Sequence, residues 1–123
     1  ETSASTHDIL YGEDGWLVHT NHYLSPKMQA LEEQGTYSSS HIRLNRARRL
    51  LRAQLGAVTV DSLQTLLRDH VNWPNSICVH EDPDDVPHER EMTLASLVMD
   101  LTSRVMWAAT GPPCEGQYVA HYV

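Results

Sequence analysis

The chain has 123 residues and a formal net charge of −7, with 41% hydrophobic and 20% charged residues. This length suits one domain with a single core, and the composition excludes a disordered or collagen-like chain. No apolar run approaches the roughly 20 residues that span a bilayer, no secretory signal opens the sequence, and the negative charge repels nucleic-acid phosphates. We therefore expect neither a membrane nor a nucleic acid as a partner.

Two further features bear on the protein's context. The sequence begins with Glu1 instead of Met, which suggests a processed chain or a piece of a longer protein. It has two cysteines, Cys78 and Cys114, which are too few for the disulfide framework of a small secreted domain. We therefore expect a cytoplasmic protein, and the sequence does not decide whether the two thiols pair.

The first predicted element is a hairpin over residues 6–23. Two runs with strand-like composition, 6–11 and 16–23, flank the turn sequence Gly-Glu-Asp-Gly at 12–15. A loop is expected over 24–40, with a short helical stretch within 28–33.

Two helices are predicted next. In residues 41–55, apolar side chains recur at the helical spacing, serines precede the helix, and Gly56 follows it. The positions of that apolar stripe are Leu44, Ala47, Leu51 and Leu55. A second helix is expected from Thr59, a good N-cap residue, to about residue 69.

The remaining chain favours strands. Residues 80–91 are rich in acids and proline and predict a loop. Residues 92–99 and 104–110 predict a second hairpin, and 117–123 predicts a last strand. The order of elements indicates an α+β fold, with two helices on one face of an antiparallel sheet.

Five arginines fall within the helix predicted at 41–55. A solvated helix face is the ordinary reading of such a cluster, and nucleic-acid binding through it stays open as an alternative. The residues are Arg43, Arg46, Arg48, Arg49 and Arg52.

The histidines and cysteines do not predict a metal site. His19 and His22 are three residues apart, so a strand would point them to opposite faces. His80 and His88 lie in the acidic loop, which we expect to be exposed. Cys78 lies between two apolar residues and is expected to be a buried structural thiol, although a Cys-His-Asn nucleophile built on it stays open.

Asn21 is the polar residue most suited to chemistry. Its amide can donate two hydrogen bonds toward a cleft, as an oxyanion-hole residue does, or it can be a structurally satisfied asparagine.

Residues 14–24 have the sequence DGWLVHTNHYL and resemble the G-x-x-V-H-T-N-H strand of a known family. This is the acyl-coenzyme A:6-aminopenicillanic acid acyltransferase family, also called isopenicillin N acyltransferases or C45 peptidases. Further markers follow in the family's order: Ser40, Arg43 to Arg46, Pro74 to Cys78, Arg90 before Thr93, and Gly111 to Glu115. The resemblance covers nearly the whole chain.

The resemblance implies a role in catalysis for two residues. Family members are N-terminal-nucleophile (Ntn) hydrolases with an αββα sandwich, and they cleave their own precursor before a nucleophilic cysteine. By this resemblance Asn21 is the side-chain donor of the oxyanion hole, and Arg90 is an arginine that orders the surroundings of the nucleophile. Cys78 and Cys114 align with non-nucleophilic positions, so the nucleophile is expected outside this chain.

The resemblance also implies the function and the partners. Residues 1–123 would be one segment, the C-terminal portion of an Ntn-type amidohydrolase or acyltransferase domain that acts through a cysteine acyl-enzyme. Its partners would be the nucleophile-bearing remainder of its own precursor and a small-molecule amide or thioester, and self-association is expected. No resident cofactor is expected, and acyl-coenzyme A would be a substrate. The alternative is a non-catalytic binding or assembly module that retains part of the fold.

Overall fold

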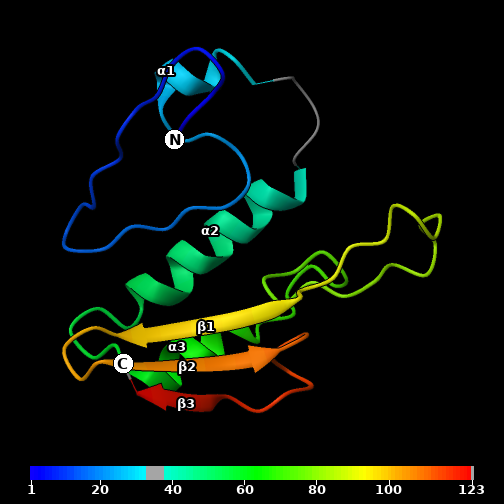
Figure 1. Ribbon diagram of the computed structural model, residues 1–123. Coiled ribbons are helices and arrows are strands. Elements are labelled where there is room, and N and C mark those ends of the chain that lie inside the picture. The colour runs from blue at the N-terminus through cyan, green and yellow to red at the C-terminus, as the bar shows by residue number, and fades with distance from the viewer. Residues whose placement is uncertain (33–37, 123) are drawn as a thin grey trace.

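The computed structural model describes residues 1–32 and 38–122, and it confirms an α+β fold (Figure 1). The helices come first in the chain and the strands follow them. The elements are α1 (Pro26–Gln29), α2 (Ser38–Arg52), α3 (Val60–Leu67), β1 (Ala95–Asp100), β2 (Val105–Thr110) and β3 (Val119–Tyr122).

The three strands form one antiparallel sheet in the order β1-β2-β3. The pairing of Asp100 with Val105 closes the hairpin between β1 and β2. In its turn, Asp100 Oδ1 accepts hydrogen bonds from the backbone N–H groups of Thr102 (2.9 Å) and Ser103 (3.0 Å). The predicted second hairpin and last strand are therefore confirmed, with slightly shorter strands than the sequence suggested.

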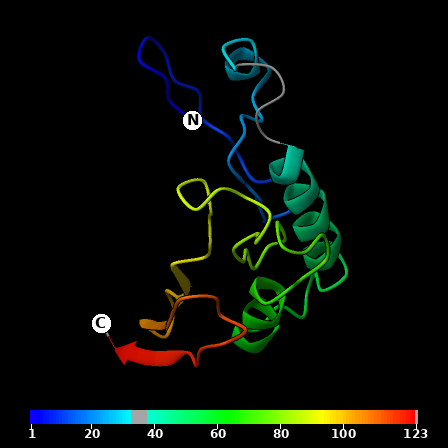
Figure 2. The ribbon, with the colours of Figure 1, turned by 90° about the vertical axis from the view of Figure 1, so that its right-hand side faces the viewer.

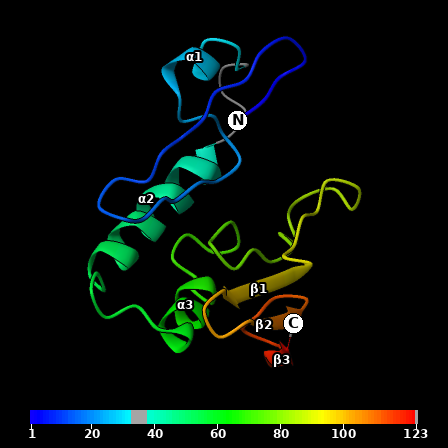
Figure 3. The same ribbon diagram turned by 60° about the vertical axis from the view of Figure 1, so that its left-hand side comes forward.

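The predicted hairpin over residues 6–23 is wrong except for its turn. Glu13 and Trp16 form an isolated bridge, and Asp14 (φ 53°) and Gly15 (φ 81°) take the left-handed conformations of a tight turn. The flanking residues form no strand. Residues 17–20 instead form no regular structure and residues 21–22 form a bend beside α2 (Figure 3). Side chains bond the backbone of this segment where strand pairing was expected.

The two long helices are confirmed with shifted bounds. α2 begins at Ser38 and ends at Arg52, whereas the prediction ran from 41 to 55. Gly56, with φ 82°, lies four residues beyond the helix end. Thr59 caps α3 as predicted: its side chain accepts from the Ser62 N–H, and the Ser62 side chain accepts from the Thr59 N–H.

A short helix was also expected within residues 28–33. α1 spans Pro26–Gln29, so it begins and ends earlier than expected, and residues 33–37 lie outside the described part.

The core lies between helices and sheet. α3 packs against β1, and α2 packs against α3, so α2 and α3 lie on one side of the sheet (Figure 2). Leu44 and Ala47 are buried on α2, and Val98, Val105 and Ala109 are buried on the sheet. Among the described residues, no helix is both long enough and apolar enough to cross a bilayer.

Candidate functional site

Asn21 lies in the bend beside α2, where two residues of that helix fix it. Its backbone N–H donates to Ser40 Oγ at 2.8 Å, and its side-chain Oδ1 accepts from Arg43 Nη2 at 2.8 Å. A guanidinium can only donate, so the Asn21 atom facing it must be the carbonyl oxygen. Within the described residues the other end of the amide, Nδ2, donates no hydrogen bond. Both of its N–H groups are thus available to a carbonyl oxygen.

Ser40 is the centre of the hydrogen bonds that hold this segment. Its fully buried hydroxyl accepts from the backbone N–H of Asn21 and of His22 (3.2 Å), and it lies 2.8 Å from His22 Nδ1. Two accepted bonds use both oxygen lone pairs, so the single hydroxyl hydrogen is left for two acceptors, Thr20 Oγ1 and an unprotonated His22 Nδ1. Ser40 Oγ also lies 3.0 Å from Thr20 Oγ1, which donates to the Ser40 carbonyl at 3.1 Å. We call this group (Thr20, Asn21, His22 and Ser40) the Ser40 hub.

The environment of His22 favours the neutral ring that the Ser40 hub requires. The ring is buried and stacks on His41 with centroids 3.7 Å apart. Burial and the neighbouring His41 both lower the pKa of His22 below its ordinary value. A neutral His22 can keep Nδ1 unprotonated as the acceptor of the Ser40 hydroxyl.

A cavity of about 460 Å³ opens beside Asn21. Its polar lining residues are His19, Thr20, Asn21 and Arg43, and its other walls are aliphatic side chains from residues 17–18, from α2 and α3, and from Ile77. This volume lies within the range of pockets that hold small molecules. The apolar lining residues are Leu17, Val18, Ala47, Leu51, Leu63, Leu66, Leu67 and Ile77.

Arg90 lies in the acidic loop and does not line this cavity. Its Nε donates to the carbonyl of Asp85 and its Nη2 to the carbonyl of Pro83, both at 3.1 Å. In the described residues Arg90 therefore clamps the backbone of its own loop and makes no ion pair with an acid. Among the residues that the structure describes, no hydrogen bond joins Arg90 to Asn21.

The arginines of α2 make different contacts. Arg43 holds Asn21, and burial lowers the pKa of its guanidinium while the negative charge of Glu91 opposes this shift. Arg46 donates to both carboxylate oxygens of Asp69, which follows α3. The Arg52 guanidinium lies 5.9 Å from the Trp16 ring. Only Arg48 and Arg49 are exposed without such a contact among these residues.

The histidines first considered for a metal are not brought together. His19 bonds Glu1 Oε1 at 2.7 Å, and His22 belongs to the Ser40 hub. A different group, which the sequence did not predict, is formed by His70, Cys78, His80 and Cys114. The Cys-x-His spacing at 78–80 with His70 eight residues before it hints at this group, but Cys114 lies far along the chain.

Cys78 is buried as expected. Burial raises the pKa of its thiol to about 11, so the free thiol is protonated at neutral pH. This protonation argues against Cys78 as a catalytic nucleophile.

Comparison with known proteins gives one family. The family model described as Acyl-coenzyme A:6-aminopenicillanic acid acyl-transferase matches residues 1–115. No curated protein matches the chain. The family match covers Asn21, the Ser40 hub, the cavity and Arg90.

Proposed function

The chain belongs to the acyl-coenzyme A:6-aminopenicillanic acid acyl-transferase family, and from this premise we propose that it supplies the oxyanion-stabilising part of an Ntn-type amidohydrolase or acyltransferase. In this proposal a cysteine thiolate outside the chain attacks an amide or thioester carbonyl and forms an acyl-enzyme. Water or an acceptor amine then takes the acyl group.

The observation that carries the proposal is the fixed orientation of the Asn21 amide. Arg43 occupies its oxygen and Ser40 holds its backbone, so Nδ2 is the end left to meet a ligand. As a thiolate attacks a carbonyl, negative charge builds on the carbonyl oxygen. A donor positioned in advance stabilises that charge without first reorganising.

The cavity beside Asn21 gives the proposal a substrate class. Its polar lining residues can face the reacting carbonyl, and its aliphatic walls can cover an apolar acyl chain. We therefore propose small acyl donors, either amides or coenzyme A thioesters, with the acyl group in this cavity. Coenzyme A enters this proposal as part of a substrate.

Arg90 enters the proposal as a positioning residue. Its two hydrogen bonds to Pro83 and Asp85 fix the loop that precedes β1, and a neighbour in that loop, Glu91, interacts electrostatically with Arg43. The planar fork of donors reaches two carbonyls at once, which a lysine ammonium cannot do in the same geometry. We therefore expect the Arg90→Lys variant to lose activity. Arg49→Lys, on the exposed surface of α2, is the control.

Exposed apolar side chains on the sheet support the proposal that a partner covers this face. Leu97 (52% exposed), Met99 (60%) and Val119 (57%) place large apolar side chains in solvent. Such a surface is typical of a face that another layer covers. We propose that the nucleophile-bearing remainder of the same protein covers it, as an αββα sandwich requires, and that the isolated chain self-associates through it.

The test uses the complete protein, including the nucleophile-bearing segment, with acyl-coenzyme A thioesters and simple amides. We expect Asn21→Ala to lower kcat by about 10²–10³-fold, the usual cost of one oxyanion donor, with little change in Tm. Asn45→Ala, an exposed asparagine on α2, is the matched control and should leave kcat unchanged. Near-normal kcat in a folded Asn21→Ala protein would favour the alternative of a non-catalytic binding or assembly module.

A further inference from the structure

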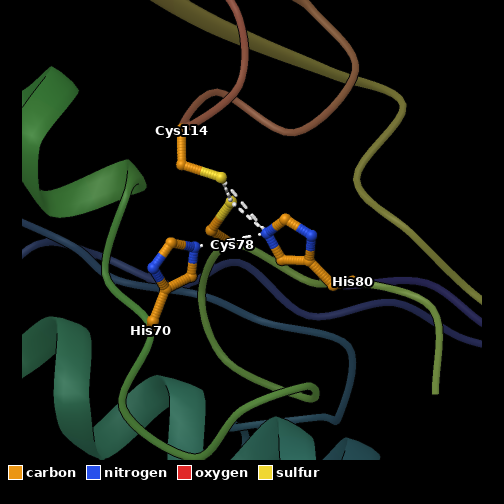
Figure 4. A group of neighbouring side chains, drawn as sticks. All are labelled: His70, Cys78, His80 and Cys114. Carbon is orange, nitrogen blue, oxygen red and sulfur yellow. Dashed lines mark hydrogen bonds between the residues drawn. The ribbon is translucent and has the colours of Figure 1, made fainter. Parts of the chain in front are cut away.

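Four side chains that commonly bind metal ions converge beyond the end of α3 (Figure 4). His70, Cys78 and His80 come from the loop between α3 and β1, and Cys114 comes from the connection between β2 and β3. One ligand atom from each residue lies within 4.8 Å of all the others. The fold thus gathers residues from distant parts of the sequence into one group, which we call the Cys2His2 cluster.

Four of the six distances between the ligand atoms are close to those of a tetrahedral site, and the two from His70 to the sulfur atoms are at most 4.8 Å. Sγ of Cys78 lies 3.5 Å from Sγ of Cys114 and 3.5 Å from His80 Nε2. His80 Nε2 lies 3.2 Å from Cys114 Sγ and 3.2 Å from His70 Nε2. A tetrahedral zinc ion, with Zn–S near 2.3 Å and Zn–N near 2.0–2.1 Å, keeps its ligand atoms about 3.3–3.8 Å apart.

Hydrogen bonding alone does not account for this arrangement. His80 Nε2 faces three neighbours at once, the two sulfur atoms and His70 Nε2. This nitrogen has either one hydrogen or one lone pair, so it can serve one of these contacts well and leaves the others unmatched. A cation at the centre satisfies all four ligand atoms together.

The surroundings of the cluster are those of a metal site. His80 Nδ1 lies 3.3 Å from Glu115 Oε1, and metal-bound histidines commonly donate their second ring N–H to a carboxylate. The Cys78 N–H donates to the Asp69 carbonyl at 3.1 Å, next to His70 in the chain. Arg68 Nε donates to the Pro113 carbonyl at 2.8 Å, next to Cys114. The backbone of each ligand-bearing segment is thus tied to residues 68–69 at the end of α3.

We propose that His70, Cys78, His80 and Cys114 bind one Zn²⁺ ion as a structural site. Two sulfur and two nitrogen ligands are a set that selects zinc, and four protein ligands leave no open position for a substrate. Binding displaces one proton from each thiol, so two protons leave as the ion enters. The ion joins the β2–β3 connection to the loop that follows α3, and its role does not depend on Asn21 or on acyl transfer.

A disulfide between Cys78 and Cys114 is the competing arrangement. The two sulfur atoms lie 3.5 Å apart, well beyond the S–S bond length of about 2.05 Å. A disulfide would also leave the two histidine rings without a common partner.

The first experiment measures the metal directly. The chain is purified without added metal or chelator, and its zinc content is measured by mass spectrometry of the elements. We expect one zinc per chain, and replacement by Co²⁺ should give the intense visible bands of a tetrahedral ion and a thiolate charge-transfer band. A folded chain that neither holds zinc nor binds added Zn²⁺ or Co²⁺ would overturn the proposal. A Cys78–Cys114 disulfide found in a chain that was kept under reducing conditions would also overturn the proposal.

The second experiment assigns the ligands. His70→Ala and Cys114→Ser change the less buried members of the cluster, so the fold should tolerate them. Each should weaken Zn²⁺ binding by more than about a hundredfold, because losing an outer partner alone costs about 10–100-fold. His88→Ala, an exposed histidine outside the cluster, is the control and should bind normally. Unchanged affinity in both ligand variants would contradict the assignment.

A third variant tests the outer contact. Glu115→Gln keeps all four ligands and should weaken Zn²⁺ binding about tenfold while the Co²⁺ spectrum keeps its tetrahedral bands. Glu81→Gln makes the same charge change beside His80 on an exposed side chain and should have no effect. Equal affinities of the two variants would show that Glu115 does not orient His80.

Discussion

Residues 6–23 and residues 95–110 have similar strand-like sequences but fold differently. The second stretch forms β1 and β2, whose backbones pair with each other. The first forms no strand, and its bend at residues 21–22 is held by side chains, above all the Ser40 hydroxyl. A strand-like sequence pattern therefore does not by itself show that a segment will pair as a strand, because it does not show what will satisfy the backbone.

The two regions should respond differently to substitution. In the sheet many backbone hydrogen bonds share the task of holding the strands, and side chains contribute mainly through burial. In the N-terminal region the hydroxyl oxygens of Ser3 and Ser40 and the carboxylate of Glu1 each accept two backbone N–H groups. One substitution there can leave more than one backbone N–H group without its acceptor.

The largest effect is expected for Ser40→Ala. It leaves the N–H groups of Asn21 and His22 without their acceptor, at a cost of about 3 kcal/mol in the free energy of unfolding. Urea unfolding measures this change, and Ser39→Ala on the same turn of α2 is the control. A loss below that of the control variant would show that the hub does not hold the segment.

A smaller effect is expected in the sheet. Val98 is 5% exposed and Met99 is 60% exposed, on opposite faces of β1. Val98→Ala should lower the free energy of unfolding by about 2 kcal/mol because apolar contact is lost and a cavity is left. Met99→Ala should stay within about 0.5 kcal/mol. Equal losses at both positions would contradict the assigned faces of the strand.

The smallest effect concerns pH and Glu1. Its carboxylate is the acceptor for the N–H groups of Leu24 (2.6 Å) and Ser25 (3.0 Å). Burial raises the pKa of Glu1, but these hydrogen bonds and the contact with His19 outweigh it and hold the pKa below the ordinary value of 4.5. The folded state then binds fewer protons than the unfolded state. The stabilisation is therefore present above pH 4.5 and is lost as the pH falls through the lowered value.

Tm measured as a function of pH tests this point. The acid-induced loss of Tm should be smaller in Glu1→Gln than in the unchanged chain, because glutamine does not titrate. Glu13→Gln, an exposed turn residue, is the control and should follow the unchanged chain. The same acid response in Glu1→Gln would show that this carboxylate is not linked to folding.

The sequence predicted the elements whose causes are local. The apolar stripe of α2, the Thr59 cap and the β1–β2 turn each depend on residues a few positions apart. The resemblance of residues 14–24 to a family strand also identified the family that the family model confirms.

The rest depends on distant contacts. The bonds from Ser40 and Arg43 to Asn21 span about twenty residues, and the Cys2His2 cluster joins Cys78 to Cys114. No periodicity in the sequence encodes such pairings, so the sequence favoured a strand at 16–23 and no metal site. The roles assigned to Asn21 and Arg90 stay predictions.

In the proposed function, α2 orients Asn21 as a donor to the reacting carbonyl. The most direct measurement is kcat of the complete protein in a double-mutant cycle of Asn21→Ala and Arg43→Met. Arg43→Met removes the bond to Asn21 Oδ1 and keeps an apolar stem, so it should lower kcat about tenfold in the unchanged background, as expected for a charged hydrogen bond. In the Asn21→Ala background it should have almost no further effect. If Arg43→Met lowers kcat equally in both backgrounds, Arg43 does not act through Asn21, and the account of the site is wrong.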